Sequence, residues 1–410
     1  MWSDRLPAIG RVLGYWRAER RTIGHGLVSL VGSTVGEIAA GIALAAMTGT
    51  LAKLPGLLIL LPAANSIRGS IFGALSSRLG TSIHTGMFEP TVKREGVLFQ
   101  NMYSATVLTF SVSLLFALLA KGVAIALGID TIDVVDLIVI SVLGGVLSSL
   151  LVGVMAVVLA LAANAYSWDL DSVATPMITA IGDMVTIPAL FISTYAVGIH
   201  WVTPTVCIVL IVITAALTVF GFASKLPRAR RTIRESLPIL VATGLLSLFA
   251  GVVVESQSEH FLRYPAFFVL IPPLLSDTGA LAATLSSRLA SKLHMGALEP
   301  KGLPQGLAFL DTSIVLLFGL WVFVLVAIGA HFVAGFFGLA SPGLGAMIEV
   351  GVVAGIVATL VLVILAYYVA IATYRLGLDP DNHGIPVVTC SSDLTAMVAL
   401  LIALVVFGLA

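Results

Sequence analysis

The sequence predicts an all-α polytopic membrane protein, built from two parallel five-helix repeats that one linker helix joins. Three observations predict this fold. First, 59% of the 410 residues are hydrophobic and only 10% are charged, a composition that needs lipid as its solvent. Second, the apolar stretches 97–127, 137–165 and 350–368 match or exceed the roughly 18 to 20 residues that span a hydrocarbon core. Third, the two halves of the chain share motifs at one constant spacing.

The chain begins with a basic segment and continues with about eleven expected transmembrane helices. Residues 1–22 hold five arginines and two tryptophans without a short apolar core and cleavage site, which indicates an interfacial helix and not a signal peptide. The apolar pattern places the spans at 23–50, 55–79, 97–128, 134–165, 173–199, 201–223, 237–256, 265–289, 307–338, 347–374 and 385–409.

An internal repeat organises these spans. Residues 75–90 match residues 285–300 at nine of sixteen positions, displaced by 210 residues. A second block keeps the same displacement without a net gap. Its paired residues are Asp169 and Asp379, Asp171 and Asp381, Pro176 and Pro386, Thr179 and Thr389, and Asp183 and Asp393. The chain therefore contains a duplicated unit, with repeat 1 expected at 23–199, a linker region at 200–234 and repeat 2 at 235–410.

The linker span sets the relative orientation of the repeats. Five spans are an odd number, so two repeats joined directly would lie upside down relative to each other. The additional span at 201–223 carries the chain back across the bilayer. We therefore expect parallel repeats, related by a pseudo-two-fold axis along the membrane normal. Equivalent residues would then face each other across that axis, as in a dimeric pore fused into one chain.

Positive charge predicts which ends of the spans are cytoplasmic. With a cytoplasmic N-terminus, seventeen Lys and Arg residues fall on inner segments and helix ends, against three on the outer ones. Cytoplasmic loops carry such an excess, so we expect a multi-pass protein of the cell membrane with its N-terminus in the cytoplasm. The formal net charge of zero provides no basic surface for nucleic acid.

Two aspartates are the strongest candidates for chemistry. Asp183 and Asp393 lie about ten residues into their helices, near the bilayer midplane at about 1.5 Å per residue. Facing carboxylates repel each other unless a cation lies between them or one is protonated. Mg²⁺ suits a site with few carboxylates and retained waters, so the pair predicts a divalent cation site. The alternative is a structural carboxylate that is hydrogen-bonded to a Ser or Thr on a neighbouring helix.

Other polar residues in or near the spans are weaker candidates for ion binding. Asp169, Asp171, Asp379 and Asp381 are expected at the inner mouth, as vestibule charges or helix caps. Glu37 and Asp277 have no like residue in the other repeat, and either one could be a coupling-ion or proton site. An ion pair between Arg68 and Asp277 is the competing interpretation. For Arg78 and Arg288, at the ends of their spans, the expected partners are Glu89 and Glu299.

These motifs resemble a known family. The repeated Pro-x6-Gly-x6-Ser-Ser-Arg-Leu helix and the Asp-x-Asp-x4-Pro-x2-Thr-x3-Asp block are similar to the membrane domain of the MgtE magnesium transporters, and more so to their fused two-unit relatives among animal solute carriers. The resemblance covers nearly the whole chain after residue 23. It implies that Asp183 and Asp393 bind Mg²⁺ in a pore, with Thr179 and Thr389 in the same block as candidate ligands.

The sequence departs from the family pattern in two places. The family has Asn after the glycine of the second helix, where this chain has Ser70 and Ala280. A ligand role for that amide would be lost or moved to Asn65. The N-terminal segment is also too short for a cytoplasmic magnesium-sensing region, so regulation by such a sensor is not expected.

The sequence-based interpretation is a transporter or channel for a divalent cation, with Mg²⁺ as the expected ion, and not an enzyme. Its metal candidates are Asp183, Asp393, Asp169, Asp171, Asp379, Asp381, Thr179, Thr389, Asn65 and Asp277. Mg²⁺ is the transported ion, no catalytic cofactor is expected, and the partners are the cation and the lipid bilayer. Two alternatives stay open: an exchanger driven by Na⁺ or H⁺, and an intramembrane aspartyl protease. The fused repeats could form a pore as a monomer, and a homo-oligomer is equally compatible with the sequence.

Overall fold

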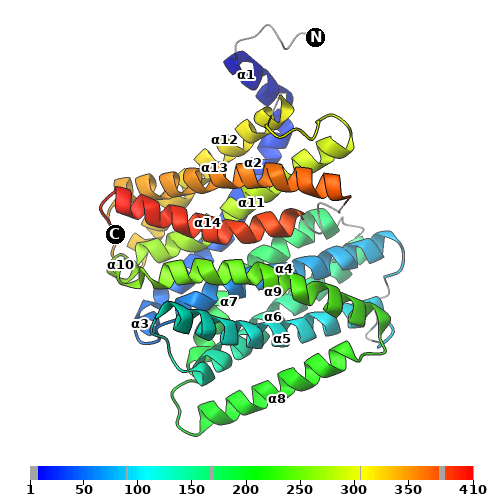
Figure 1. Ribbon diagram of the computed structural model, residues 1–410, viewed down its shortest axis with the longest axis vertical. Coiled ribbons are helices and arrows are strands. Elements are labelled where there is room, and N and C mark those ends of the chain that lie inside the picture. The colour runs from blue at the N-terminus through cyan, green and yellow to red at the C-terminus, as the bar shows by residue number, and fades with distance from the viewer. Residues whose placement is uncertain are drawn as a thin grey trace. The chain divides into compact units, whose positions relative to one another are not determined.

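The computed structural model describes residues 8–88, 91, 93–166, 170–304, 306–377 and 384–409, and these residues form helices and no β-strand (Figure 1). The helices are α1 (Ala8–Ala18), α2 (Arg20–Ala46), α3 (Thr48–Leu51), α4 (Leu57–His84), α5 (Val97–Leu127), α6 (Val134–Tyr166), α7 (Leu170–Thr194), α8 (Val202–Phe222), α9 (Pro227–Glu255), α10 (Ser258–Arg263), α11 (Ala266–His294), α12 (Leu307–Phe336), α13 (Leu344–Leu376) and α14 (Ile385–Val406).

Most of these helices are long enough to cross a membrane. Within the described residues, ten helical segments have the length and hydropathy of a membrane span. They occur in α2, α4, α5, α6, α8, α9, α11, α12, α13 and α14. Helix α7, expected as a further span, contributes the shorter apolar stretch Ile181–Thr194. The prediction of an all-helical, multi-pass membrane protein is confirmed.

The chain divides into two compact units that interleave the sequence repeats. Unit 1 comprises Met1–Gly41 and Arg263–Ala410, and unit 2 comprises Ile42–Leu262. Unit 1 therefore combines α2, the first helix of repeat 1, with α11 to α14 of repeat 2. Unit 2 combines α4 to α7 of repeat 1 with α9, the first helix of repeat 2, which packs on α4 and α5. The two repeats exchange their first helices.

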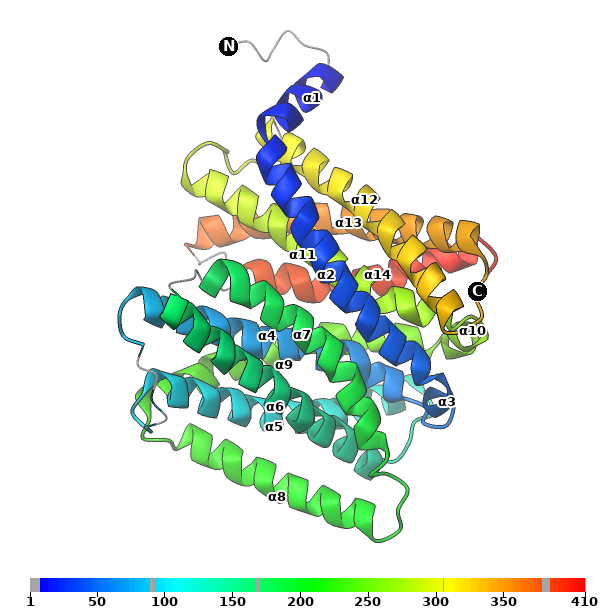
Figure 2. The ribbon, with the colours of Figure 1, turned by 180° about the vertical axis from the view of Figure 1, so that it is seen from behind.

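Glycines allow the same close helix approach in both units. A Cβ atom on Gly41 would lie under 3.0 Å from the backbone of Val269, and one on Gly251 equally close to the backbone of Ile59. Gly41 and Gly251 are equivalent in the repeat, as are Ile59 and Val269. Small residues let membrane helices approach closely. Equivalent helices therefore cross in both units: α2 crosses α11 in unit 1 (Figure 2), and α9 crosses α4 in unit 2.

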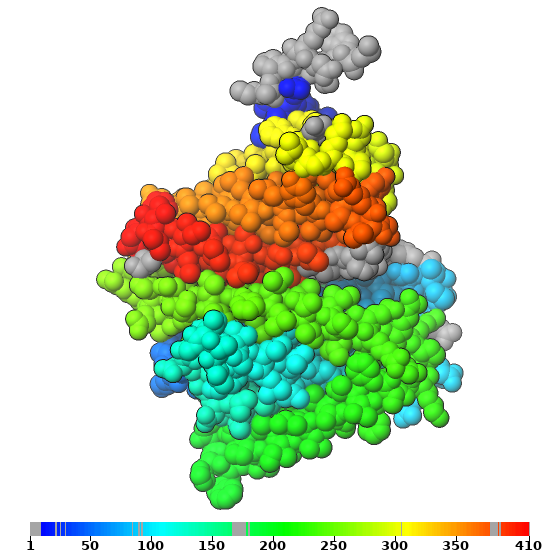
Figure 3. Space-filling view, in the orientation of Figure 1, coloured from blue at the N-terminus to red at the C-terminus, as the bar shows by residue number. Residues whose placement is uncertain are grey.

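Each unit has a central helix. In unit 1, α11 contacts α12, α13 and α14, and in unit 2, α4 contacts α5, α6, α7 and α9. The linker helix α8 contacts α5 and α6 and lies on the surface of unit 2 (Figure 3). Only 17% of the most apolar window of α8 is buried, against 83% for α11. Helix α8 therefore presents apolar side chains such as Ile208, Val212 and Phe220 outward, as a lipid-facing helix does.

Candidate functional site

The two aspartates predicted at mid-depth are buried, one in each unit. Asp183 on α7 is 5% exposed and Asp393 on α14 is 8% exposed. Both carrying helices pack against the central helix of their own unit, α7 on α4 and α14 on α11. An ionisable side chain within a span is costly unless a partner or ion compensates it. Each unit therefore carries one such buried carboxylate.

The turn of α14 before Asp393 packs closely on α11. A Cβ atom on Gly279 would lie 2.8 Å from the Oγ atom of Ser392, so only glycine fits at this point of α11 without a shift. The Ser392 hydroxyl donates a hydrogen bond to the carbonyl oxygen of Thr389. Thr389, a predicted oxygen ligand, is half-buried one turn before Asp393. Gly279 thus makes room on α11 for the turn that precedes Asp393.

The structure does not describe the side chains of the residues predicted at the inner mouth, nor that of Thr179. Asp169, Asp379 and Asp381 lie outside the described residues. For Asp171 and Thr179 the structure describes only the helical backbone of α7. Their roles as ligands stay predictions.

Two polar residues of α4 lie inside unit 2. Arg68 is 2% exposed and donates hydrogen bonds from Nη1 to the carbonyl oxygen of Gly145 and, at 2.6 Å, to Ser149 Oγ on α6. Asn65, another predicted ligand, is half-buried, and its Oδ1 atom is buried without a hydrogen-bond partner in the described part of the chain. An amide oxygen in that state is available to a cation.

Helix exchange brings together two carboxylates that the sequence had left separate. Asp277 of α11 and Glu37 of α2 are each 1% exposed. Thr34 Oγ1 lies 2.9 Å from Asp277 Oδ2, and Ser276 donates to Glu37 Oε1 at 2.7 Å. Since Thr34 and Glu37 are one turn apart on α2 and Ser276 and Asp277 are neighbours on α11, both acidic groups belong to one contact between the helices. The partner of Asp277 in this contact is α2.

The arginines at the ends of α4 and α11 have partners other than those expected. Arg288 binds Asp311 of α12, with 2.8 Å between Nη2 and Oδ1, and Arg78 donates from Nε to Asn101 Oδ1 at 2.9 Å. The expected partner Glu299 instead pairs with Lys301 at 2.7 Å. The interpretation of Glu299 was wrong because a long arginine side chain reaches back along its helix to a neighbouring span. Glu89 lies outside the described residues.

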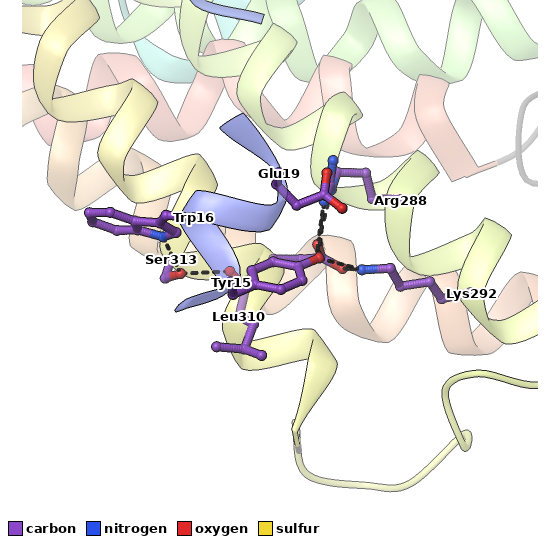
Figure 4. Close-up of polar contacts among 8 residues, drawn as sticks. Tyr15, Trp16, Glu19, Arg288, Lys292, Leu310 and Ser313 are labelled. Carbon is purple, nitrogen blue, oxygen red and sulfur yellow. Dashed lines mark hydrogen bonds and ion pairs between the residues drawn. The ribbon is translucent and has the colours of Figure 1, made fainter. Parts of the chain in front are cut away.

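Asp311 also binds the N-terminal helix α1 through Tyr15, which Figure 4 shows beside Lys292 and Arg288. Tyr15 donates its hydroxyl to Asp311 Oδ1 at 2.8 Å and accepts from Lys292 Nζ at 2.9 Å. Lys292 forms a second ion pair with Asp311, and Trp16 donates to Ser313 at 3.0 Å. This cluster docks α1 on α11 and α12. The sequence analysis did not predict this cluster, although Asp311 stands out as a lone aspartate in the apolar segment 307–338.

A model of one protein family matches most of both repeats. The MgtE family, described as a divalent cation transporter, matches residues 61–193 and 271–403. From 61 to 271 and from 193 to 403 the displacement is the same 210 residues, so the independent match reproduces the repeat register read from the sequence.

Curated relatives are similar over most of the chain. Solute carrier family 41 member 3 is 26% identical in mouse (84% of this chain and 74% of that protein) and 27% identical in rat (84% and 78%). Human solute carrier family 41 member 2 is 23% identical over 85% of this chain and 64% of its own length.

Proposed function

The chain belongs to the MgtE family of divalent cation transporters, and we propose that it carries Mg²⁺ across the cell membrane along a path that Asp183 and Asp393 line. The observation that carries this proposal is the burial of these aspartates at 5% and 8% exposure, at equivalent positions of a duplicated sequence. Asp183 and Asp393 are the residues whose charge the transported ion would offset.

The ligand chemistry favours Mg²⁺ over softer metals. All candidate ligands are oxygens: the carboxylates of Asp183 and Asp393, the hydroxyls of Thr179 and Thr389, and the amide oxygen of Asn65. Oxygen ligands suit Mg²⁺, which dehydrates reluctantly and needs few protein groups. In this proposal Asp169, Asp171, Asp379 and Asp381 form the inner mouth and concentrate cations before they enter.

The proposal includes an arrangement of the repeats. Parallel repeats about a pseudo-two-fold axis along the membrane normal would bring Asp183 and Asp393 to one site, within a single chain. The fused repeats then replace a dimer, and the N-terminus lies in the cytoplasm. An aspartyl protease is disfavoured, because the two aspartates stand in one motif at equivalent places of a repeat and not in two unlike motifs.

Ion flux into liposomes tests the proposal. Purified protein is reconstituted with a Mg²⁺-sensitive dye inside the vesicles, as wild type and as Asp183→Asn and Asp393→Asn. We expect each substitution to reduce uptake severely, because the isosteric amide removes the charge that binds the ion. Exposed Asp130 provides the matched control Asp130→Asn, which should transport normally. Near-normal flux in both pore variants would exclude these residues from the path.

Imposed gradients separate a channel from an exchanger. Uptake that follows the Mg²⁺ gradient and membrane potential alone indicates a channel, and uptake that requires an opposing Na⁺ or pH gradient indicates an exchanger. Inhibition by a transition-state aspartyl inhibitor without any cation flux would favour the protease instead.

A further inference from the structure

Arg68 of α4 is a buried cation of unit 2 that forms hydrogen bonds but no ion pair in the described part of the chain. It is 2% exposed, and its Nη1 atom donates to the carbonyl oxygen of Gly145 and to Ser149 Oγ. Both acceptors are uncharged groups of α6. An arginine side chain keeps its proton in proteins, and a charge within a span is costly unless an opposite charge offsets it. An interaction of Arg68 with a nearby carboxylate is therefore expected.

The Arg68 guanidinium has donors that these bonds do not use. A guanidinium has five N–H donors, and the bonds to Gly145 and Ser149 both come from Nη1. The Nε atom is buried without a hydrogen-bond partner among the residues that the structure describes. A buried donor that is left unpaired costs free energy. Arg68 therefore has donors available for a carboxylate oxygen.

The Arg68 side chain passes α7 next to Asp183. A Cβ atom added to Gly182 would lie 3.9 Å from Arg68 Cγ, an ordinary van der Waals contact. Asp183 is the next residue of α7, and α7 packs on α4 within unit 2. Because consecutive Cα atoms are about 3.8 Å apart, the guanidinium and the Asp183 carboxylate lie on the order of 10 Å apart or closer. Charges at such a separation interact inside a protein.

We propose that Arg68 is a fixed countercharge in the Mg²⁺ path, which lowers the affinity of Asp183 for the transported ion. While the ion is bound, the guanidinium repels it. When the ion leaves, the guanidinium offsets the Asp183 charge in its place. This inference rests on the proposed function, because it takes Asp183 to bind the ion, and it adds a residue that sets how tightly the ion is held.

The countercharge belongs to one repeat. At the place of Arg68 the second repeat has Thr278, a buried residue whose hydroxyl donates to the carbonyl oxygen of Leu274. Repeat 2 therefore has no cation at the position of α11 that corresponds to Arg68. A path must hold an ion firmly enough to admit it and weakly enough to release it. Asp393 serves the first requirement in this proposal, and Asp183 with Arg68 serves the second.

Ser149 keeps the guanidinium bound to α6. Its Oγ atom lies 2.6 Å from Arg68 Nη1 and 3.0 Å from Thr109 Oγ1 of α5, so a second helix fixes this acceptor. Without the Ser149 hydroxyl, Nη1 loses an acceptor and the guanidinium is freer to approach Asp183. Removing the hydroxyl should therefore weaken Mg²⁺ binding, whereas removing the guanidinium should strengthen it. These opposite signs distinguish a countercharge from a structural role.

Calorimetric titration of Mg²⁺ into the full chain in lipid nanodiscs tests the proposal. We expect Arg68→Met to tighten binding by about tenfold, since that change corresponds to about 1.4 kcal/mol and unit charges on the order of 10 Å apart interact at this scale in proteins. Arg68→Lys, which keeps the charge, should bind Mg²⁺ as the wild type does. Ser149→Ala should weaken binding by about threefold or more, because a hydrogen bond to a charged group is lost. Arg231→Met, at a side chain that is 79% exposed, is the control and should leave the affinity unchanged.

Mg²⁺ uptake into liposomes provides a second measurement. Arg68→Met should lower both the Mg²⁺ concentration of half-maximal uptake and the maximal rate, because an ion that is held more tightly leaves more slowly. A variant that merely damages the fold would lose maximal rate without any gain in affinity.

Three outcomes decide the proposal. Unchanged or weaker Mg²⁺ binding by folded Arg68→Met protein would overturn it. If that variant does not fold, unchanged or tighter binding by Ser149→Ala would overturn it instead. Asp183→Asn separates this inference from the proposed function: wild-type Mg²⁺ binding and uptake by Asp183→Asn would contradict both. Weaker binding by Asp183→Asn, without tighter binding by Arg68→Met, would exclude the countercharge alone.

Discussion

Arg288 of α11 and Asp311 of α12 form a buried ion pair at the positions where, in the other repeat, Arg78 donates a hydrogen bond to the uncharged amide of Asn101. Asp311 is 0% exposed and Asn101 is 6% exposed. The change from amide to carboxylate in repeat 2 accompanies a change of Ser82 to Lys292 and the docking of Tyr15. The additional negative charge of Asp311 is thus balanced by the ammonium group of Lys292 and by the donating hydroxyl of Tyr15.

Asp311→Asn should destabilise the protein. It leaves Lys292, whose side chain is 18% exposed, without its anionic partner, and it leaves Arg288, which is 19% exposed, with only the longer ion pair to Glu19 at 3.5 Å. Breaking a buried ion pair from one side costs about 3–5 kcal/mol, and the partial exposure of the cations reduces this, so we expect about 2 kcal/mol. Thermal unfolding in detergent measures the change.

A double substitution checks the cause of that loss. Asp311→Asn with Lys292→Ser recreates the arrangement of repeat 1, with arginine, asparagine and serine, and should recover part of the stability. Glu299→Gln, at an exposed pair, is the control and should change stability by under about 0.5 kcal/mol. If the double variant is no more stable than the single one, the uncompensated lysine is not the cause.

Tyr15→Phe should loosen α1 from unit 1. The hydroxyl donates to Asp311 and accepts from Lys292, and a lost hydrogen bond costs about 1 kcal/mol, more when a charged group loses its partner. Hydrogen exchange should therefore accelerate in α1 and stay unchanged in α8. Tyr195→Phe, at a side chain that is 71% exposed, is the matched control. Unchanged protection of α1 would show that Trp16 and Glu19 suffice to dock it.

Gly41→Ala and Gly251→Ala should each destabilise the helix crossing of their unit. An added Cβ would meet backbone atoms of Val269 or Ile59, which cannot move aside as a side chain can. Overpacking of this kind costs about 1–3 kcal/mol. Gly32→Ala is the control within α2, because nothing lies within 4 Å of its added Cβ. A loss of stability in the control as large as in Gly41→Ala would exclude steric contact as the cause.

The spans, the repeat and the buried Asp183 and Asp393 could be predicted because they depend on hydropathy, self-similarity and the cost of charge in lipid. These properties can be read along one chain. The exchange of first helices could not, since the apolar pattern of α2 does not specify which of the two central helices it packs against. One residue in the sequence indicated the exchange: Glu37 of α2 is acidic, whereas its equivalent in the second repeat is Ser247. Its acidic neighbour Asp277 lies on the other repeat's second helix, so the two meet only when α2 packs there.

The orientation of the chain and the parallel relation of its repeats can be tested together by cysteine labelling. Asp130 follows α5 and Ala340 follows α12 at the equivalent place of the second repeat, and both are exposed. The native Cys207 and Cys390 are buried and provide a low background.

Parallel repeats place Asp130 and Ala340 on the same side of the membrane, whereas inverted repeats place them on opposite sides. The excess of Lys and Arg on the predicted inner segments puts that side outside the cell. In intact cells, Asp130→Cys and Ala340→Cys should therefore both react with an impermeant maleimide. Glu299→Cys, at an exposed position after α11, should react only after permeabilisation. Labelling of just one of the first two would mean inverted repeats, and Asp183 and Asp393 would then lose the symmetry by which they share one site.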